Sequence, residues 1–208
     1  MAKKSVKAAL RQEVADVFRR AILDAAEQVF GAHGFADAKM ADIAKRAGLA
    51  AGTIYKHFES KEDVFGALLE RCGEGLDQAL DEQVADAPGD VAERLIALAR
   101  TVLTQCEQRR ATFRLLLDHG SPDMRKVGGL TAEKRYQGYV ARFTEVFEEG
   151  VRTGAISDEL RPAEMAHIFT GAMHGLIHAW LIQGAKTELA SRCTLLVSAL
   201  LRGVGART

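Results

Sequence analysis

The sequence predicts an all-α protein in which a small N-terminal domain of three helices precedes a larger helical domain. The 208-residue chain contains only three prolines. Its apolar residues recur three and four positions apart, which is the spacing of an amphipathic helix and not of a strand. Two short helical patterns also flank the glycine at position 48, as in a helix-turn-helix unit. We expect the two domains to be 1–60 and 61–208.

The N-terminal domain is expected to form three helices around a small core. Their predicted ranges are 11–33, 40–47 and 51–57. Gly34 is expected to end the first helix and Gly48 the second, because glycine readily adopts the positive φ of a helix stop. In the third helix Ile54 is expected to face inward, which leaves the polar side chains beside it on or near the outer face.

The C-terminal domain is expected to be a series of longer helices. Their predicted ranges are 61–84, 91–103, 113–120, 130–152, 163–183 and 187–202. Ser60 is interpreted as the N-cap of the first of these helices, with Asp63 completing an imperfect capping box. Pro88 and Gly89 separate the first two helices, and residues 121–129, SPDMRKVGG, are interpreted as a loop.

Charge and cysteine content narrow the functional class. The formal net charge is zero, but residues 1–60 contain ten Lys and Arg against seven Asp and Glu. A basic partner surface is therefore expected at the N-terminal end. The three cysteines, Cys72, Cys106 and Cys193, are widely spaced and odd in number, which fits a reducing compartment better than a disulfide framework.

The sequence also predicts a cytoplasmic protein that does not enter a membrane. The N-terminal residues MAKKSVKAAL are basic but have no apolar segment behind them, so they do not form a secretory signal. No uninterrupted apolar run approaches the roughly 20 residues that a membrane helix requires.

Helix, glycine turn and second helix together form the helix-turn-helix pattern of DNA-binding proteins. Helix 40–47 is expected to cross the DNA backbone, and helix 51–57 is expected to enter the major groove. The hydroxyl, imidazole and ammonium groups on helix 51–57 are of the kinds that bind phosphate. The basic arm has two open interpretations, a contact with the minor groove or phosphates and a disordered solubilising tail. It consists of Lys3, Lys4, Lys7 and Arg11.

Two stretches, ILDAAEQVFGAHGF (22–35) and MADIAKRAGLAAGTIYKHFESKEDVF (40–65), resemble the N-terminal domain of the TetR family of transcriptional repressors. The resemblance implies an all-helical homodimer that binds a palindromic operator and is released by a small molecule. It places Ala51 and Gly52 at the positions that read base edges. The residues that it places against DNA phosphates are Thr53, Tyr55, His57 and Lys61.

Two positions depart from the family pattern. Lys39 stands where the N-cap of the second helix is usually Ser or Thr, and Ala50 stands where the recognition helix often starts with a polar residue. A missing cap costs roughly 0.5–2 kcal/mol, although Lys39 can compensate by reaching a phosphate. With Ala51 and Gly52 at the base-reading positions, we expect specificity to depend on thymine methyl contacts, Lys56 and DNA shape.

The resemblance also assigns dimerisation and ligand binding to the C-terminal domain. The last two helices carry the small residues that close helix pairing requires, namely Gly171, Ala172, Gly175, Ala179, Ser191, Ser198 and Ala199. Aromatic and methionine side chains are typical of apolar pockets, so a largely apolar ligand is expected. The candidate ligand-binding residues are Phe113, Phe143, Phe147, Phe169, Met173, His174 and Trp180.

Three other functions remain open at this stage. His167, His174 and His178 share one helix face, and the last two have the HxxxH spacing of metal ligands, so a metal-sensing regulator is an alternative to histidines that are simply hydrogen-bonded. Cys72 and Cys106 could sense oxidants, although such thiols more often pack. A helical adaptor without DNA binding is the third alternative. We find no catalytic constellation and expect neither enzymatic activity nor a cofactor.

Overall fold

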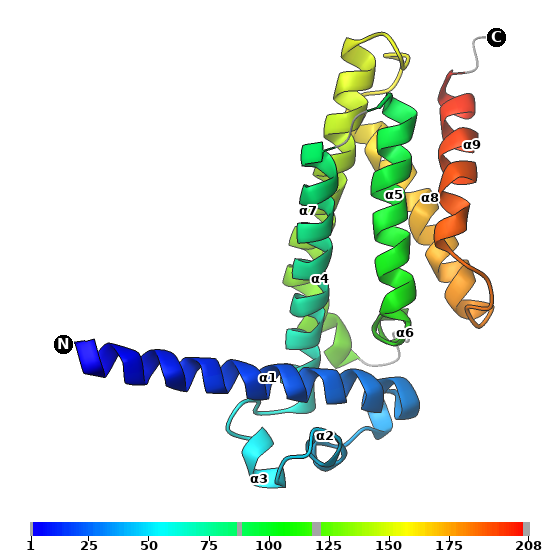
Figure 1. Cartoon of the computed structure of the whole chain (residues 1–208). Helices are drawn as coiled ribbons and strands as arrows, with labels where there is room; N and C mark the ends of the chain where they lie inside the picture. The colour runs from blue at the N-terminus through cyan, green and yellow to red at the C-terminus, as the bar shows by residue number, and fades with distance from the viewer. Residues whose placement is uncertain (1, 87–88, 118–121, 206–208) are drawn as a thin grey trace. The chain divides into compact units, whose positions relative to one another are not determined.

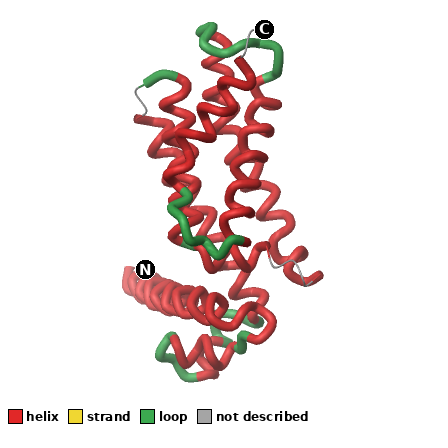
Figure 2. The backbone as a smooth tube through the Cα atoms, turned by 90° about the vertical axis from the view of Figure 1, so that its right-hand side faces the viewer, coloured by secondary structure: helices red, strands yellow, loops and turns green. Residues whose placement is uncertain are grey.

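The computed structural model describes residues 2–86, 89–117 and 122–205, and within these ranges every regular element is a helix (Figures 1 and 2). The chain divides into two compact units. One unit comprises Met1–Arg71 and Ala111–Gly129, and the other comprises Cys72–Arg110 and Leu130–Thr208. The prediction of an all-α fold with a helix-turn-helix near the N-terminus is confirmed.

The helices follow one another along the chain with short connections between most of them. In chain order they are α1 (Ala2–Asp37), α2 (Met40–Arg46), α3 (Ala51–Ile54), α4 (Lys61–Asp86), α5 (Val91–Gln108), α6 (Arg110–Leu117), α7 (Pro122–Arg152), α8 (Pro162–Ile182), the 3₁₀ turn η1 (Ala190–Arg192) and α9 (Cys193–Gly205). Helix α4 contributes its first residues to one unit and the remainder to the other.

Helices α1 and α7 begin well before the positions that the sequence predicts. Helix α1 starts at Ala2 instead of near position 11, and it is interrupted at the predicted stop, Gly34, where φ is 74°. Helix α7 starts at Pro122, so the loop prediction is wrong for 122–129, while residue 121 lies outside the described residues. Proline fits the first position of a helix because its ring presets φ and its missing N–H needs no partner there. The last residues of the predicted helix 113–120 also lie outside the described residues.

Two other helices are shorter than predicted. Helix α3 ends at Ile54, and the chain continues in a tight turn in which the N–H of Lys56 donates to Thr53 O at 3.1 Å and that of His57 to Ile54 O at 3.0 Å. These bonds span three residues, as in a 3₁₀ turn, and so close the helix early. The predicted helix 187–202 is divided into η1 and α9.

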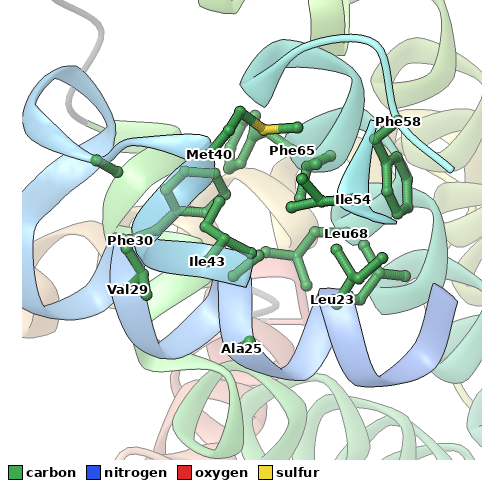
Figure 3. Close-up of a cluster of buried hydrophobic side chains, with 14 of the residues drawn as sticks. Leu23, Ala25, Val29, Phe30, Met40, Ile43, Ile54, Phe58, Phe65 and Leu68 are labelled. Atoms are coloured by element: carbon green, nitrogen blue, oxygen red, sulfur yellow. The ribbon is translucent and has the colours of Figure 1, made fainter. Parts of the chain in front are cut away.

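The first unit is organised around aromatic and branched side chains that come from different helices (Figure 3). Phe30 of α1, Ile43 of α2, Ile54 of α3 and Phe65 of α4 are all fully buried. Leu115 of α6 belongs to the same cluster. Burying each such side chain contributes about 1.5–3 kcal/mol, so this shared core fixes the short helices α2 and α3, which could not persist alone.

The second unit combines an apolar core with ion pairs between its helices. Its core side chains include Leu103, Phe143 and Phe169, which are buried on α5, α7 and α8 respectively. Arg142 of α7 lies 3.3 Å from Asp77 and 2.7 Å from Asp81, both on α4. The guanidinium is only partly exposed, and its pairing with two carboxylates one helical turn apart fixes the register of α7 against α4.

Candidate nucleic-acid interface and ligand-binding core

The turn between α2 and α3 is a Schellman motif centred on Gly48. The N–H of Leu49 donates to Ala44 O at 2.9 Å, and the N–H of Gly48 donates to Lys45 O at 3.2 Å. Gly48 has a φ of 71°, which glycine adopts without the steric cost that a side chain adds. The half-buried Leu49 packs on the core of the first unit. The turn therefore sets the direction in which α3 leaves α2.

Neither short helix has a side-chain cap at its N-terminus. Lys39 and Ala50 occupy the N-cap positions of α2 and α3 in an extended conformation, and neither makes a capping hydrogen bond. The first N–H groups of both helices therefore have no bond from these side chains, and such groups bind anions. By contrast, Ser60 Oγ accepts a hydrogen bond from the N–H of Asp63 at 3.1 Å ahead of α4.

Helix α1 holds the C-terminal end of α3 in place through two neighbouring side chains. The guanidinium of Arg19 lies 4.4 Å from the ring centroid of Phe58 and donates to His57 O at 3.3 Å. The ring of Phe18 lies 5.6 Å from that of His57. Phe58 is itself buried, so the turn after α3 is fixed from within by packing and from α1 by a cation.

The residues predicted to face DNA lie mostly at the surface of α3 and the following turn. Ala51, Gly52, Tyr55 and Lys56 are exposed, whereas Thr53 is half-buried. Tyr55 retains 58% of its surface. A Cβ added to Gly52 would meet no other atom of the chain. The face of α3 that carries these residues is therefore exposed to solvent, and its first positions have small side chains.

His57 and Lys61, both predicted phosphate ligands, already have contacts within the chain. His57 is half-buried against Phe18. The ammonium of Lys61 donates to Phe35 O at 2.9 Å and Ala36 O at 2.8 Å, and it lies 3.5 Å from Ala38 O. Carbonyl oxygens at a helix C-terminus attract a cation. Lys61 therefore ties the start of α4 to the end of α1, and its phosphate contact stays a prediction.

Several of the predicted ligand-binding residues lie together in the core of the second unit. The ring of Phe169 on α8 lies 5.1 Å from that of Phe143 and 6.1 Å from that of Phe147, both on α7. Met173 is also buried, while Trp180 is buried with its indole N–H bonded to Thr187 O at 2.6 Å. Phe113 belongs to the other unit.

A polar cluster extends this aromatic core along α7 and α8. His174 stacks on Tyr139, with ring centroids 5.8 Å apart, and lies 5.6 Å from Tyr136. The Tyr136 hydroxyl lies 3.3 Å from His167 Nδ1 and 3.4 Å from Thr170 Oγ1. Although His174 keeps solvent contact, the surrounding protein atoms displace water from its ring and lower its pKa below the ordinary 6.5.

The histidine face does not take the form of a metal centre in the described part of the chain. His167 uses a ring nitrogen with Tyr136, and His174 contacts two tyrosine rings. No group of three or more His, Cys, Asp or Glu side chains is placed to hold a metal ion within residues 2–86, 89–117 and 122–205.

An open groove lies elsewhere in the second unit, between α5 and α9. It has a volume of about 570 Å³, and none of the predicted ligand-binding residues lines it. Its lining residues are Ala92, Ile96, Thr194, Val197, Ser198, Leu201 and Arg202. The groove and the aromatic core are thus separate features of this unit.

One face of α8 is exposed and apolar, and it carries two glycines between its larger side chains. Ile168 retains 47% and Ile182 retains 69% of its surface. Between them, a Cβ added to Gly171 or Gly175 would meet no atom of the chain. On α9, Leu195 is also 64% exposed. Exposed apolar residues with glycines between them allow another helix to approach closely.

The glycine turn, the buried anchors of α3 and its exposed outer face define a helix-turn-helix DNA-binding protein with a second helical unit. Residues 22–68 match the family described as bacterial regulatory proteins, tetR family. The transcriptional regulator AcrR of Shigella flexneri is 27% identical over 88% of this chain and 87% of that protein. The N-terminal domain is thus of the TetR family, and the chain is a DNA-binding transcriptional regulator.

Two solved structures have the same fold over nearly the whole chain. The fatty acid degradation regulator FadR of Bacillus halodurans superposes with a TM-score of 0.79 at 26% identity, covering 91% of this chain and 97% of that one. FadR of Bacillus subtilis in complex with stearoyl-CoA superposes with a TM-score of 0.75 at 22% identity, covering 89% and 98%. None of the described helices is long and apolar enough to cross a membrane.

Sequence reasoning missed the polar residues that accompany the aromatic core. Tyr136, Tyr139 and Thr170 are not among the predicted site residues, and Cys106 is named there only as a thiol that could sense oxidants. The signal that could have found Tyr139 is a hydroxyl-bearing residue at a core-facing position, one turn before Phe143. The proximity of Cys106 on α5 to Tyr139 could not have been found in this way, because it depends on which helices pack together.

Proposed function

We propose that this regulator is a repressor that binds a palindromic operator as a homodimer and releases it when a long-chain acyl thioester binds the second unit. The DNA-binding part of this proposal rests on the way in which α3 is held. Its outer residues are exposed, while Ile54 on its inner face is buried in the core of the first unit. Gly48 sets the direction of α3, and Phe58 and Arg19 hold its far end.

Dimerisation is supported by the exposed face of α8. One α3 helix offers too few groups to bind DNA tightly, whereas a two-fold dimer doubles its contacts on a palindrome. The glycines at 171 and 175 leave room for a partner helix, and Ile168 and Ile182 supply apolar surface around them. Leu195 extends the apolar surface to α9.

The ligand class rests on the apolar core and on the similar fold that binds an acyl thioester. Phe143, Phe147 and Phe169 form a continuous aromatic cluster, which suits an alkyl chain. The similar FadR of Bacillus subtilis is seen with stearoyl-CoA. A hydrocarbon chain that enters such a core has to displace packed side chains, so its binding changes the arrangement of the helices around it.

Selection of bound DNA from a random pool tests the DNA-binding half. A repeated two-fold symmetric sequence is expected, with half-sites spaced near one helical turn or modestly more. Binding of that sequence is then measured by fluorescence anisotropy at several salt concentrations.

Lys56→Met should reduce the slope of log affinity against log salt by about one, because the ammonium that Lys56 brings to the DNA surface displaces about one counterion. The matched control is Lys186→Met, since Lys186 is an exposed lysine in the second unit. A failure to enrich any symmetric sequence would contradict the proposed function.

A further inference from the structure

The Tyr139 hydroxyl is a buried polar group that has no hydrogen-bond partner among the described residues. Only 5% of the Tyr139 side chain is exposed. Buried hydroxyl groups are nearly always paired, because an unpaired one gives up its bonds to water without replacement. An exception within a folded core therefore requires an explanation.

Side chains from three helices enclose this hydroxyl-bearing ring. On α7, the ring of Phe143 lies 5.3 Å from that of Tyr139 in an edge-to-face arrangement. On α8, His174 stacks against the ring at 5.8 Å. Cys106 of α5 is buried and close enough that its charge would raise the pKa of Tyr139. Tyr139 thus lies where α5, α7 and α8 meet, beside the aromatic cluster proposed to accept an alkyl chain.

The fold itself does not use the Tyr139 oxygen. A phenylalanine at position 139 would retain the ring contacts with Phe143 and His174 and would leave no hydroxyl unpaired. Tyr136, one turn earlier on α7, differs in this respect because its hydroxyl is already placed beside His167 and Thr170. The two tyrosines therefore form a matched pair, one with its hydroxyl partnered within the chain and one without.

The surroundings determine which kind of ligand atom could pair with this hydroxyl. Burial, and to a lesser extent Cys106 and Tyr136, raise the pKa of Tyr139 well above its usual value, so the hydroxyl stays protonated and acts as a donor. Burial together with the nearby Glu107 raises the pKa of the Cys106 thiol to about 12. The Cys106 thiol is thus neutral, and the lowered pKa of the stacked His174 keeps its imidazole neutral near pH 7, so a buried anion would lack a counter-charge from either side chain.

We propose that the Tyr139 hydroxyl donates a hydrogen bond to the neutral carbonyl oxygen of the acyl thioester, with the alkyl chain lying among the adjacent aromatic rings. This inference rests on the proposed function, since it assigns a residue to the recognition of that ligand. Tyr139 makes the site selective for an acyl chain that carries a carbonyl group, because hydrocarbon alone would leave the hydroxyl unpaired.

The test compares wild-type protein with Tyr139→Phe and with the matched control Tyr136→Phe. Binding of stearoyl-CoA is followed by the fluorescence of Trp180, the single tryptophan of the chain, and release of the selected operator is followed by anisotropy. Thermal unfolding of each ligand-free variant is measured in parallel.

Tyr139→Phe is expected to weaken stearoyl-CoA binding roughly fivefold to tenfold, as loss of one buried hydrogen bond does, and to shift operator release by the same factor. The ligand-free Tyr139→Phe protein should unfold at the same temperature as wild type or higher, because no bond within the chain is lost. Tyr136→Phe should unfold at a lower temperature and bind stearoyl-CoA as wild type does.

The other outcomes separate the inference from the proposed function. If wild type and Tyr139→Phe release the operator at the same stearoyl-CoA concentration, the inference is wrong and the repressor function stands. If Tyr139→Phe lowers the unfolding temperature and leaves the affinity unchanged, the hydroxyl serves the fold, and the inference again fails. If wild type binds its operator but not stearoyl-CoA, both the acyl-thioester proposal and the role of Tyr139 are overturned.

Discussion

At the scale of single residues, the DNA-facing surface depends on side chains that need not touch DNA. Arg19 lies on α1, yet its guanidinium covers Phe58 and binds the carbonyl of His57 at the end of α3. Such a residue positions the recognition helix from behind. Its contribution is distinguishable from a phosphate contact, because only a phosphate contact releases counterions from DNA.

We expect Arg19→Met to weaken operator binding by roughly twofold to fivefold, which corresponds to the free energy of one exposed cation–π contact. The salt dependence of binding should stay as in wild type, in contrast to Lys56→Met. Anisotropy titrations at several salt concentrations measure both quantities. Arg20→Met is the control, since Arg20 is the exposed neighbour whose guanidinium lies by a carbonyl of its own helix. A shallower salt slope for Arg19→Met would assign this residue to the phosphates instead.

The histidine on the aromatic cluster gives a second residue-scale prediction. Because loss of hydration lowers the pKa of His174 below 6.5, the unfolded chain binds a proton there more readily than the folded chain. The resulting loss of folding stability is absent at pH values above the pKa of the histidine in the unfolded chain, and it grows as the pH falls below that value. The free energy of unfolding should therefore decrease between about pH 7.5 and pH 5.5.

His174→Gln should flatten this pH dependence, and His178→Gln is the matched control for removing an imidazole from the same helix. Urea denaturation at a series of pH values measures the slope. The comparison is informative because both side chains are exposed on α8, while His174 is the one that contacts Tyr136 and Tyr139. Equal slopes for His174→Gln and wild type would exclude this titration.

At the scale of helices, the sequence predicts best the boundaries that a single local residue determines. Gly34 interrupts α1 and Gly48 follows the end of α2, as expected, since the positive φ of each depends on the glycine itself. The start of α7 at Pro122 was missed, because Gly128 and Gly129 disfavour a helix locally, and whether the chain overrides such a preference depends on the surrounding structure. The pairing of Tyr139 with α5 and α8 has the same origin and could not be predicted from spacing alone.

Lys61 illustrates how a residue predicted for one role has another in the folded chain. The family resemblance places it against a phosphate, while the structure places its ammonium against the carbonyls at the end of α1. Lys61→Met removes these bonds and also the ammonium that lies 4.8 Å from the ring centroid of Phe35. We expect the unfolding free energy to fall by about 1–2 kcal/mol, as for hydrogen bonds to a charged group.

The matched control for this prediction is Lys56→Met, because Lys56 is an exposed lysine of the same unit. Its replacement should leave stability within about 0.5 kcal/mol of wild type. Chemical denaturation of both variants measures the difference. If Lys61→Met were as stable as Lys56→Met and lost operator affinity alone, the phosphate role would account for Lys61 without the helix-capping role.

At the scale of the whole molecule, the proposed repressor function requires two chains. The exposed apolar residues of α8 and α9 would be a liability in a monomer, since a surface of this kind promotes association. Gly171 and Gly175 lie one helical turn apart on α8, and a Cβ added at either position would have no neighbouring side chain of its own chain within 4 Å. A bulky residue there therefore disturbs the partner and not the fold of the protomer.

We expect Gly175→Gln to convert the dimer to a folded monomer and to weaken operator binding by at least about tenfold, because the two half-sites are then bound independently. The control is Gly75→Gln on α4, since an added Cβ there also meets nothing and the helix propensity changes by the same amount. Sedimentation velocity measures the assembly state, circular dichroism the helix content and anisotropy the operator affinity. A Gly175→Gln protein that remains dimeric would place the dimer interface on a different surface, and the groove between α5 and α9 would be the next region to test.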